Sequence, residues 1–443
     1  MEKRSLLVSL GIALAIIAIA VGTITQRHPS VLAGHPDPSC NSGRPVNVPI
    51  ASHIGVPFEA QFPDGVLVIG TNVKTKGESN VVLHAFGSDC RSISSFGDNG
   101  VATVRLSSST AEADALTAVS FNQMLILGGQ RNQWIVGELS ENGRINAAFG
   151  TGGWIRLHPP IPARAGLPPS AAATTAITSH SGMIYVAGTD GRANCCIGSY
   201  IASISQSGVL NNQFGTQGWV APTGFLSSYS TSLIRDGSGG VLAYGEIVFM
   251  GCGGPQFFRF NAAGVAYASF DSKLGQSLKT IAPPPKLLAP VLLVRKQGGF
   301  NVFGDITSSC SPHTSTKDHQ AAEAILPNGE IDPSFGANGT TAIASDIAAS
   351  FWAFQLSTGE LMFVTQTTAN PSASPSTSNL KFREFTANGR LDTSFGRNGL
   401  ANYNVTKLNS NPSGLQLNVL LTPNNSFLVI ETTKTQLAFM RVG

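Results

Sequence analysis

One short turn recurs along this chain and constrains its fold more than any other feature. Aligned on a central phenylalanine, the copies read CRSISSFGDNG, GRINAAFGTGG, GVLNNQFGTQG, GVAYASFDSKLG, GEIDPSFGANG and GRLDTSFGRNG. The aromatic positions are Phe96, Phe149, Phe214, Phe270, Phe335 and Phe395, at spacings of 53, 65, 56, 65 and 60 residues. A period of about 60 residues is longer than a leucine-rich or ankyrin repeat and fits one four-stranded propeller blade with its loops.

The segments between the turns read as further β-strands. Three short β-branched runs separate successive turns. We number the four strands of each blade from the ring axis outward, and the second-strand run recurs seven times: DGVLVIGTN, NQMLILGGQ, SGMIYVAGTD, GGVLAYGEI, GGFNVFGDI, GELMFVTQT and NSFLVIETT. The turn then connects the third strand to the outermost one. It occurs six times because the chain begins and ends within the cycle, with PVNVPIAS available as a strand ahead of the first full set. We therefore predict an all-β fold, a seven-bladed β-propeller of four-stranded blades over residues 46–443.

The motif G-x-[IL]-[DN]-x-x-F-G-x-x-G resembles the delta-60 repeat, a family of β-propeller repeats in exported bacterial proteins. The strand ending in LILGGQ also resembles a Kelch blade, but only loosely. Two copies depart from the pattern: Cys90 replaces the first glycine of the Phe96 copy, and Asp271 follows Phe270 where other copies have glycine. The resemblance implies a propeller outside the cytoplasm and implies no defined molecular role.

The turn has a structural interpretation and a functional one. Asn146, Asn211, Asp332 and Asp392 can accept hydrogen bonds within their own turns, while the glycines adopt positive φ. The phenylalanine then packs beneath the turn and holds one blade against the next. The alternative is a calcium loop, but the spacing lacks the alternating Asp and Asn of such loops, and Tyr267 takes this position in one copy.

The N-terminus predicts export. MEKR precedes an apolar run over residues 6–24, so residues 1–34 are either a signal peptide or an uncleaved membrane anchor. Cleavage would follow Ala18-Ile19-Ala20 or Val31-Leu32-Ala33. Both alternatives put the rest of the chain in the periplasm, on the cell surface or outside the cell, with residues 35–45 as a linker.

Charge and cysteine content agree with an exported protein. Only 12% of the residues are charged and the net charge is +3, which argues against nucleic acid as a partner. We expect no cofactor, no metal site and contact with membrane only through the N-terminal segment. The even number of cysteines favours disulfides among Cys40, Cys90, Cys195, Cys196, Cys252 and Cys310. We predict a Cys40–Cys90 bond, because bonding offsets the loss of glycine at position 90, and a bond from Cys252 to Cys195 or Cys196.

Strand alternation assigns the loops to two faces. The repeated turns share one face, and the dissimilar segments TDGRANCCIG, EIVFMGCGGPQ, DITSSCSPHTSTKDHQAAE and TQTTANPSASPSTSNLK lie on the other, with HPPIPARAGLPPSAAA and APPPKLLAP. That face carries the candidate ligand-binding residues His158, Arg164, His313, Lys317, Asp318 and His319. No catalytic motif is present. The sequence thus favours a non-enzymatic scaffold that binds a protein or a glycan; the alternative is a glycan hydrolase or lyase with carboxylates near the central channel.

Overall fold

The computed structural model describes most of the chain beyond the N-terminal segment. The described residues are 35–50, 54–75, 77–106, 108–120, 122–160, 171–179, 181–189, 199–221, 231–235, 239–249, 252–270, 272–274, 286–296, 298–307, 319–344, 350–368, 378–404, 416–432 and 437–443. Within them, no helix is long and apolar enough to cross a bilayer. The apolar run over residues 6–24 lies outside them.

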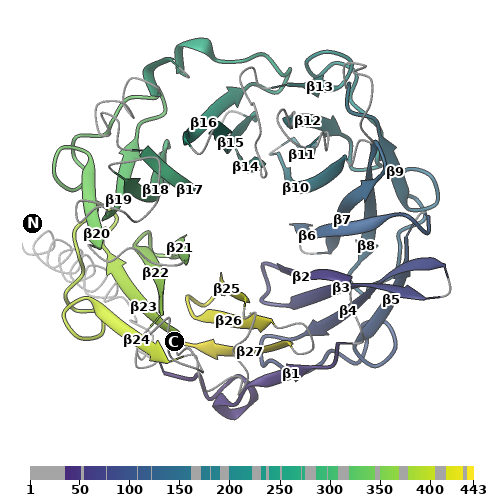
Figure 1. Ribbon diagram of the computed structural model, residues 1–443, viewed down its shortest axis with the longest axis horizontal. Helices are drawn as coiled ribbons and strands as arrows, with labels where there is room; N and C mark the ends of the chain where they lie inside the picture. Colours follow the sequence, from purple (N-terminus) through teal and green to yellow (C-terminus); the bar gives the residue numbers. More distant parts are fainter. Residues whose placement is uncertain are drawn as a thin grey trace, which may run out of the picture.

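The protein is all-β and forms a β-propeller, a ring of antiparallel sheets around a central axis (Figure 1). The first sheet contains β2 (Ile54–Gln61), β3 (Leu67–Thr75), β4 (Glu78–Phe86) and β5 (Val101–Arg105). An eight-stranded sheet follows, with β6 (Glu112–Ser120), β7 (Gln123–Gln130), β8 (Gln133–Ser140), β9 (Trp154–Leu157), β10 (Ala172–Thr178), β11 (Ile184–Thr189), β12 (Ser199–Ile204) and β13 (Trp219–Val220). Its halves, β6–β9 and β10–β13, are joined through the pair Ala172 and Gly129.

Four further sheets complete the ring among the described residues. The third contains β14 (Thr231–Arg235), β15 (Val241–Phe249) and β16 (Cys252–Phe260). The fourth contains β17 (Lys286–Val294), β18 (Phe300–Thr307), β19 (His319–Ile325) and β20 (Thr340–Ala344). The fifth contains β21 (Ser350–Gln355), β22 (Leu361–Thr368), β23 (Ser378–Phe385) and β24 (Leu400–Asn404). The last contains β25 (Gln416–Leu421), β26 (Phe427–Thr432), β27 (Leu437–Val442) and β1 (Val46–Val48).

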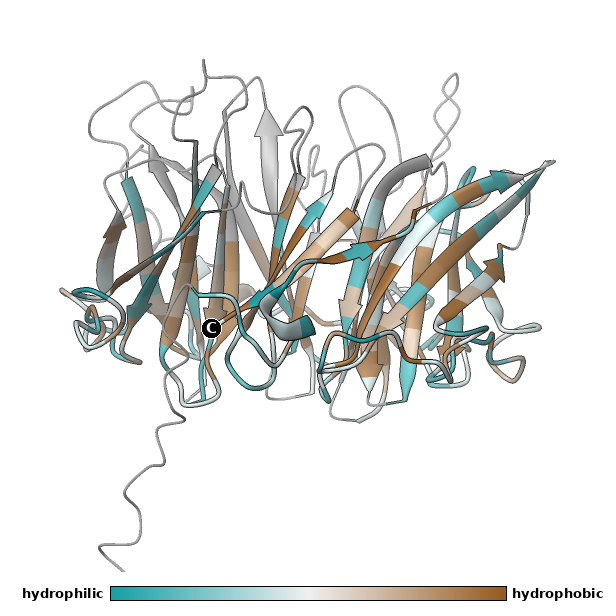
Figure 2. Ribbon diagram, turned by 90° about the horizontal axis from the view of Figure 1, so that it is seen from below, coloured by the Kyte–Doolittle hydropathy of each residue, from teal (hydrophilic) through white to brown (hydrophobic). Residues whose placement is uncertain are grey.

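The hydrophobic core lies between neighbouring sheets. Strand side chains alternate between the two faces of a sheet, so each sheet packs against the sheet before it and the sheet after it. In the second strand of the first sheet, Val68 packs towards β6–β8, while Leu67 and Ile69 pack towards the last sheet. Figure 2 shows hydrophobic residues running along the strands, with the described turns gathered at the lower edge. All seven runs predicted as second strands are strands, namely β3, β7, β11, β15, β18, β22 and β26.

The repeated turns satisfy their own polar groups. Asp332 Oδ1 accepts hydrogen bonds from the Ser334 N–H at 3.0 Å and the Ser334 hydroxyl at 2.6 Å, and Asp392 makes the same two bonds in its own turn. Asn146 and Asn211 each accept one hydrogen bond from the backbone N–H two residues on. These oxygens stabilise the turn itself, which supports the structural interpretation over a calcium loop.

The same turns join one sheet to the next. The Gly97 N–H donates to the Asn142 carbonyl of the following turn at 2.9 Å. Gly143, with φ of 75°, lies against the Phe96 ring so closely that a Cβ there would be 2.6 Å from the ring. A side chain at position 143 would therefore collide with the ring as well as strain the backbone. The rings of five copies are buried and that of Phe395 is half-buried.

The N-terminal segment closes the ring. Strand β1 pairs with β27 as the outer strand of the last sheet (Figure 1), and Pro36 bridges Val442. Residues 35–45, treated above as a linker, thus include a segment that contacts the last sheet. The contacts repeat those of the turn: the Asp37 N–H donates to the Arg441 carbonyl at 2.9 Å, as the Asp332 N–H donates to the Ala324 carbonyl at 2.8 Å.

Residues 37–43 are therefore a further copy of the turn. The segment Asp37-Pro-Ser-Cys40 corresponds to Asp332-Pro-Ser-Phe335, so Cys40 stands where the other copies have phenylalanine. The Asn41 N–H donates to the Asp89 carbonyl at 3.2 Å, which is the bond that Gly97 makes with the next turn elsewhere. Alignment of the repeats on the aromatic residue does not detect this copy, because Cys40 replaces that residue.

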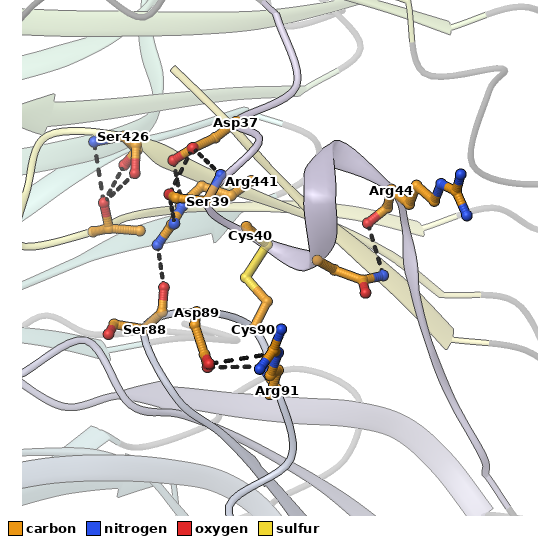
Figure 3. Close-up of a disulfide and its surroundings, with 12 residues drawn as sticks. Asp37, Ser39, Cys40, Arg44, Ser88, Asp89, Cys90, Arg91, Ser426 and Arg441 are labelled. Carbon is orange, nitrogen blue, oxygen red and sulfur yellow. Dashed lines mark hydrogen bonds and ion pairs between the residues drawn. A yellow bond between two sulfur atoms is a disulfide. The ribbon is translucent and has the colours of Figure 1, made fainter.

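The predicted Cys40–Cys90 disulfide forms at this closure, with a Cα–Cα distance of 5.0 Å (Figure 3). Cys90 has a φ of 64°, the left-handed conformation that glycine adopts in the corresponding position of the other copies. This conformation costs a residue with a side chain about 1 to 2 kcal/mol, whereas a disulfide contributes about 2 to 4 kcal/mol to the stability of the fold. Beside the bond, Arg441 Nε contacts Asp37 Oδ2 at 2.7 Å in a buried ion pair.

Candidate functional site

The structure describes two of the six candidate ligand-binding residues. His158 follows β9 and is exposed, and His319 is the first residue of β19 and is half-buried. Arg164, His313, Lys317 and Asp318 lie outside the described residues, as do Cys195, Cys196 and Cys310. Cys252 opens β16. The bond predicted for it stays a prediction.

Two segments predicted as long loops, EIVFMGCGGPQ and APPPKLLAP, have most of their residues in strands. The segment EIVFMGCGGPQ forms a hairpin: Phe249 of β15 pairs with Cys252 of β16, which leaves two residues between the strands. This corrects its assignment to the long loops: Ile247 and Val248, residue types that favour strands, pair with Gly254 and Gly253 in the ladder. The other segments contribute their ends to strands, and Lys286 to Pro290 of APPPKLLAP belong to β17.

Connections at the two edges of the ring differ in how uniform they are. The connection from third to outer strand has 13 or 14 residues between β4 and β5, β8 and β9, β12 and β13, β19 and β20, and β23 and β24. The connection from second to third strand has two residues between β3 and β4, β7 and β8, and β15 and β16. It has nine between β11 and β12, eleven between β18 and β19, and nine between β22 and β23. We call the edge with the connections from third to outer strand the turn edge, and the opposite edge, with the connections from second to third strand, the variable edge.

A polar network crosses three innermost strands near the ring axis. Trp352 Nε1 of β21 donates to Asn418 Oδ1 of β25 at 2.9 Å, and Asn418 Nδ2 donates to Glu59 Oε1 of β2. Burial raises the pKa of the Glu59 carboxyl, and the hydrogen bond from Asn418 opposes this shift only in part. The network therefore holds a carboxyl that takes up a proton more readily than usual.

The neighbouring innermost strand carries two more carboxylates. Asn72 of β3 fixes β6 by donating to the Ala113 carbonyl at 2.7 Å and accepting from the Ala113 N–H at 3.0 Å. The next residue, Asp114, has an exposed side chain, but the protein around its carboxyl displaces part of the hydrating water. This desolvation and the nearby Glu112 charge raise the pKa of Asp114 to about 6. Lys74 Nζ contacts Glu112 Oε1 at 2.7 Å.

These carboxylates could not be selected by spacing, because they come from different sheets. The available signal was the acidic residue inside an otherwise apolar innermost strand, as in PFEAQF and AEADAL. Within the described part of the chain, no group of three or more His, Cys, Asp or Glu side chains is placed to hold a metal ion.

A hollow of about 260 Å³ lies at the ring closure, beside the disulfide. It is lined by buried Leu67, Leu428 and Phe439 and by the polar residues Asp64 and Arg441. The Arg441 guanidinium donates hydrogen bonds to the Asp37 carboxylate, the Ser39 hydroxyl and the Ser88 carbonyl (Figure 3). We assign no ligand to this hollow.

No protein-family model matches the chain, and no curated protein matches it in sequence. Among solved structures, the polysaccharide lyase Uly1 shares 9% identity with a TM-score of 0.46, covering 95% of this chain and 94% of that chain. The β-propeller domain of Nup133 from Vanderwaltozyma polyspora shares 12% identity with a TM-score of 0.44, covering 89% and 97%. The subtype N10 neuraminidase-like protein of A/little yellow-shouldered bat/Guatemala/060/2010 shares 9% identity with a TM-score of 0.40, covering 87% and 94%.

Glu323 on β19 is a buried carboxyl away from the axis. Its residue is 4% exposed, and its Oε2 atom has no hydrogen-bond partner among the described residues. Burial raises its pKa to about 8. At neutral pH the folded protein therefore keeps this side chain protonated, whereas the unfolded chain ionises it.

We expect Glu323→Gln to stabilise the protein increasingly as the pH rises. Below pH 4 both states of the wild type are protonated, so the two proteins should be alike. Between about pH 4.5 and 8 the unfolded wild type loses its proton first, and the wild type loses stability on the order of 4 kcal/mol relative to the glutamine variant. Urea unfolding at pH 4, 6 and 8 measures the difference. Glu330→Gln is the control: hydrogen bonds from Lys273 and Asn328 lower the pKa of exposed Glu330, so its slope should have the opposite sign. A flat difference for Glu323→Gln would contradict the assignment.

Proposed function

We propose that this chain is an exported, seven-bladed β-propeller that acts as a binding scaffold and presents its variable edge to a protein or glycan partner. The observation that carries the proposal is the contrast between a turn edge of uniform length and an opposite edge whose connections range from two to eleven residues. Variation in the loops of a rigid scaffold is typical of recognition. The turn edge uses its polar groups to join the sheets and so has a structural role.

The topology supports seven blades of one repeat each. The eight-stranded sheet divides into β6–β9 and β10–β13, each with the strand order of the other sheets and joined by one residue pair. The three-stranded sheet occupies the place of the fourth blade. The last blade takes its outer strand, β1, from the N-terminal side of the chain. The recurrence of the turn also supports assignment to the delta-60 repeat type.

The disulfide supports a location outside the cytoplasm, because structural disulfides persist in oxidising compartments. Residues 1–34 would then serve as a signal peptide or as a membrane anchor. Mass spectrometry of the N-terminus of protein isolated from the extracytoplasmic fraction distinguishes these alternatives. A full-length chain recovered only from the cytoplasm would reject both.

Removing one long connection tests the binding face. We expect replacement of residues 308–318 by a two-residue turn to abolish partner capture without unfolding the protein, because β15 and β16 already form a hairpin of that kind. The measurement is a pull-down with residues 35–443 as bait, with circular dichroism as the check on folding. Alanine at exposed Arg91 and Arg144 on the turn edge is the control and should leave capture unchanged. If the shortened protein keeps its partners and the turn-edge variant loses them, the assigned face is wrong.

A second candidate function is glycan hydrolysis or elimination near the ring axis. It is favoured by the innermost-strand carboxylates, because Glu59 with its raised pKa suits a proton donor and Asp114, with a pKa of about 6, suits a base near neutral pH. Trp352, which is linked to Glu59 through Asn418, would offer an aromatic surface near that carboxyl. A screen of polysaccharides with the wild type, Glu59→Gln and Asp114→Asn tests this. Turnover that both variants abolish would establish the enzyme, and absence of turnover together with glycan binding would favour the scaffold.

A further inference from the structure

The closure of the ring differs chemically from the other joints between sheets. At four other joints a phenylalanine ring lies against the glycine of the next turn, as Phe335 lies against Gly389, where a Cβ would be 2.6 Å from the ring. At the closure both partners are replaced, by Cys40 and Cys90, and both are buried. A noncovalent contact that needs no oxidant has become a covalent bond that does.

We propose that the closure of the ring is conditional on oxidation, with the Cys40–Cys90 disulfide as the latch. When the bond forms, the two thiols lose two protons and two electrons to a small disulfide oxidant such as oxidised glutathione, which is reduced to two thiols. Reduction by a dithiol reverses the reaction. With both thiols free, the closing segment, residues 36–48, separates from the last sheet while the other sheets stay folded.

Three features make the reduced closure weak. Cys40 lacks the aromatic ring that buries apolar surface at the other joints. Reduced Cys90 keeps its positive φ without the bond that holds it there. Strand β1 pairs with β27 over three residues, whereas the outer strands β5, β9, β20 and β24 pair over four or five; of the described outer strands, β13 alone pairs over fewer, namely two.

The buried ion pair does not compensate for these losses. Arg441 and Asp37 are each only 5% exposed while the closing segment contacts the last sheet. Separation returns both charges to water, and hydration then replaces much of their mutual attraction. The proposed redox-dependent closure does not depend on the identity of the binding partner. Its link to secretion, in which the ring closes after the chain reaches an oxidising compartment, rests on the proposed location.

Hydrogen exchange of residues 35–443 in oxidised and reduced glutathione tests the latch. We expect reduction to lower the protection of β1 and β27 by at least about tenfold, as for a local opening, and to leave β18 and β22 unchanged. Unchanged protection of β1 on reduction would overturn the proposal. Equal loss in every sheet would also overturn it, because the disulfide would then support the whole fold.

The chain offers a matched control. The double variant Cys40→Phe with Cys90→Gly restores the residues of the repeated joint and keeps the other four cysteines. We expect its β1 protection to be the same in oxidised and reduced glutathione. Cys40→Ser with Cys90→Ser should exchange like the reduced wild type under both conditions. If the restored joint is as sensitive to reduction as the wild type, another cysteine is responsible; the wild-type comparison decides the matter if a variant does not fold.

Discussion

Replacing Phe335 with alanine is expected to lower the free energy of unfolding by about 3 to 5 kcal/mol, the usual cost of removing a buried aromatic ring. Phe335 is 1% exposed and covers Gly389 of the next turn, so its loss leaves a cavity between two sheets. Gly389 cannot fill the cavity because it has no side chain. Urea unfolding measures the change.

Phe395→Ala is the matched control. Phe395 holds the same place in its own turn but is half-buried, so its ring loses less contact on truncation. Its loss should cost clearly less than that of Phe335. Equal costs at the two sites would show that the ring acts within its own turn and does not join sheets.

Replacing Arg295 with methionine is expected to cost about 3 to 5 kcal/mol, because it leaves a buried carboxylate without its partner. Arg295 Nη1 lies 2.7 Å from Asp332 Oδ2, and both side chains are largely buried. Burial alone would raise the pKa of Asp332, but hydrogen bonds from Ser334 and Arg295 and the guanidinium charge outweigh it and lower that pKa. The stability from this pair is thus present above about pH 4, the range of an unfolded aspartate, and is lost as the pH falls through the lowered pKa.

Lys273→Met controls for the loss of a positive charge in the same region. Lys273 pairs with Glu330 at 2.8 Å, but both side chains are about half exposed, so the expected cost is much smaller than that of Arg295→Met. Thermal unfolding of the two variants at pH 7 gives the comparison. Similar melting temperatures for Arg295→Met and Lys273→Met would contradict a buried role for the ion pair.

The sequence predicted most of the local structure of this protein. The second-strand runs are strands, and the turn geometry follows from residues close in sequence, such as Asp332 with Ser334. The Cys40–Cys90 bond was predicted because Cys90 interrupts a position that otherwise requires glycine. The prediction failed for EIVFMGCGGPQ, which was assigned to the long dissimilar loops, because β15 pairs with β16 through most of that segment.

Strand alternation, turn hydrogen bonds and the demand for glycine at positive φ act over a few residues, so the sequence alone determined the repeated unit and the propeller class. Contacts between distant residues were decided only by the tertiary structure. Asp37 meets Arg441 across the length of the chain, and Glu59 meets Asn418 because the first and last sheets are neighbours in a closed ring. The copy of the turn that contains Cys40 was hidden for the same reason, since the backbone contacts that define it join the two ends of the fold and leave no aromatic residue to mark it.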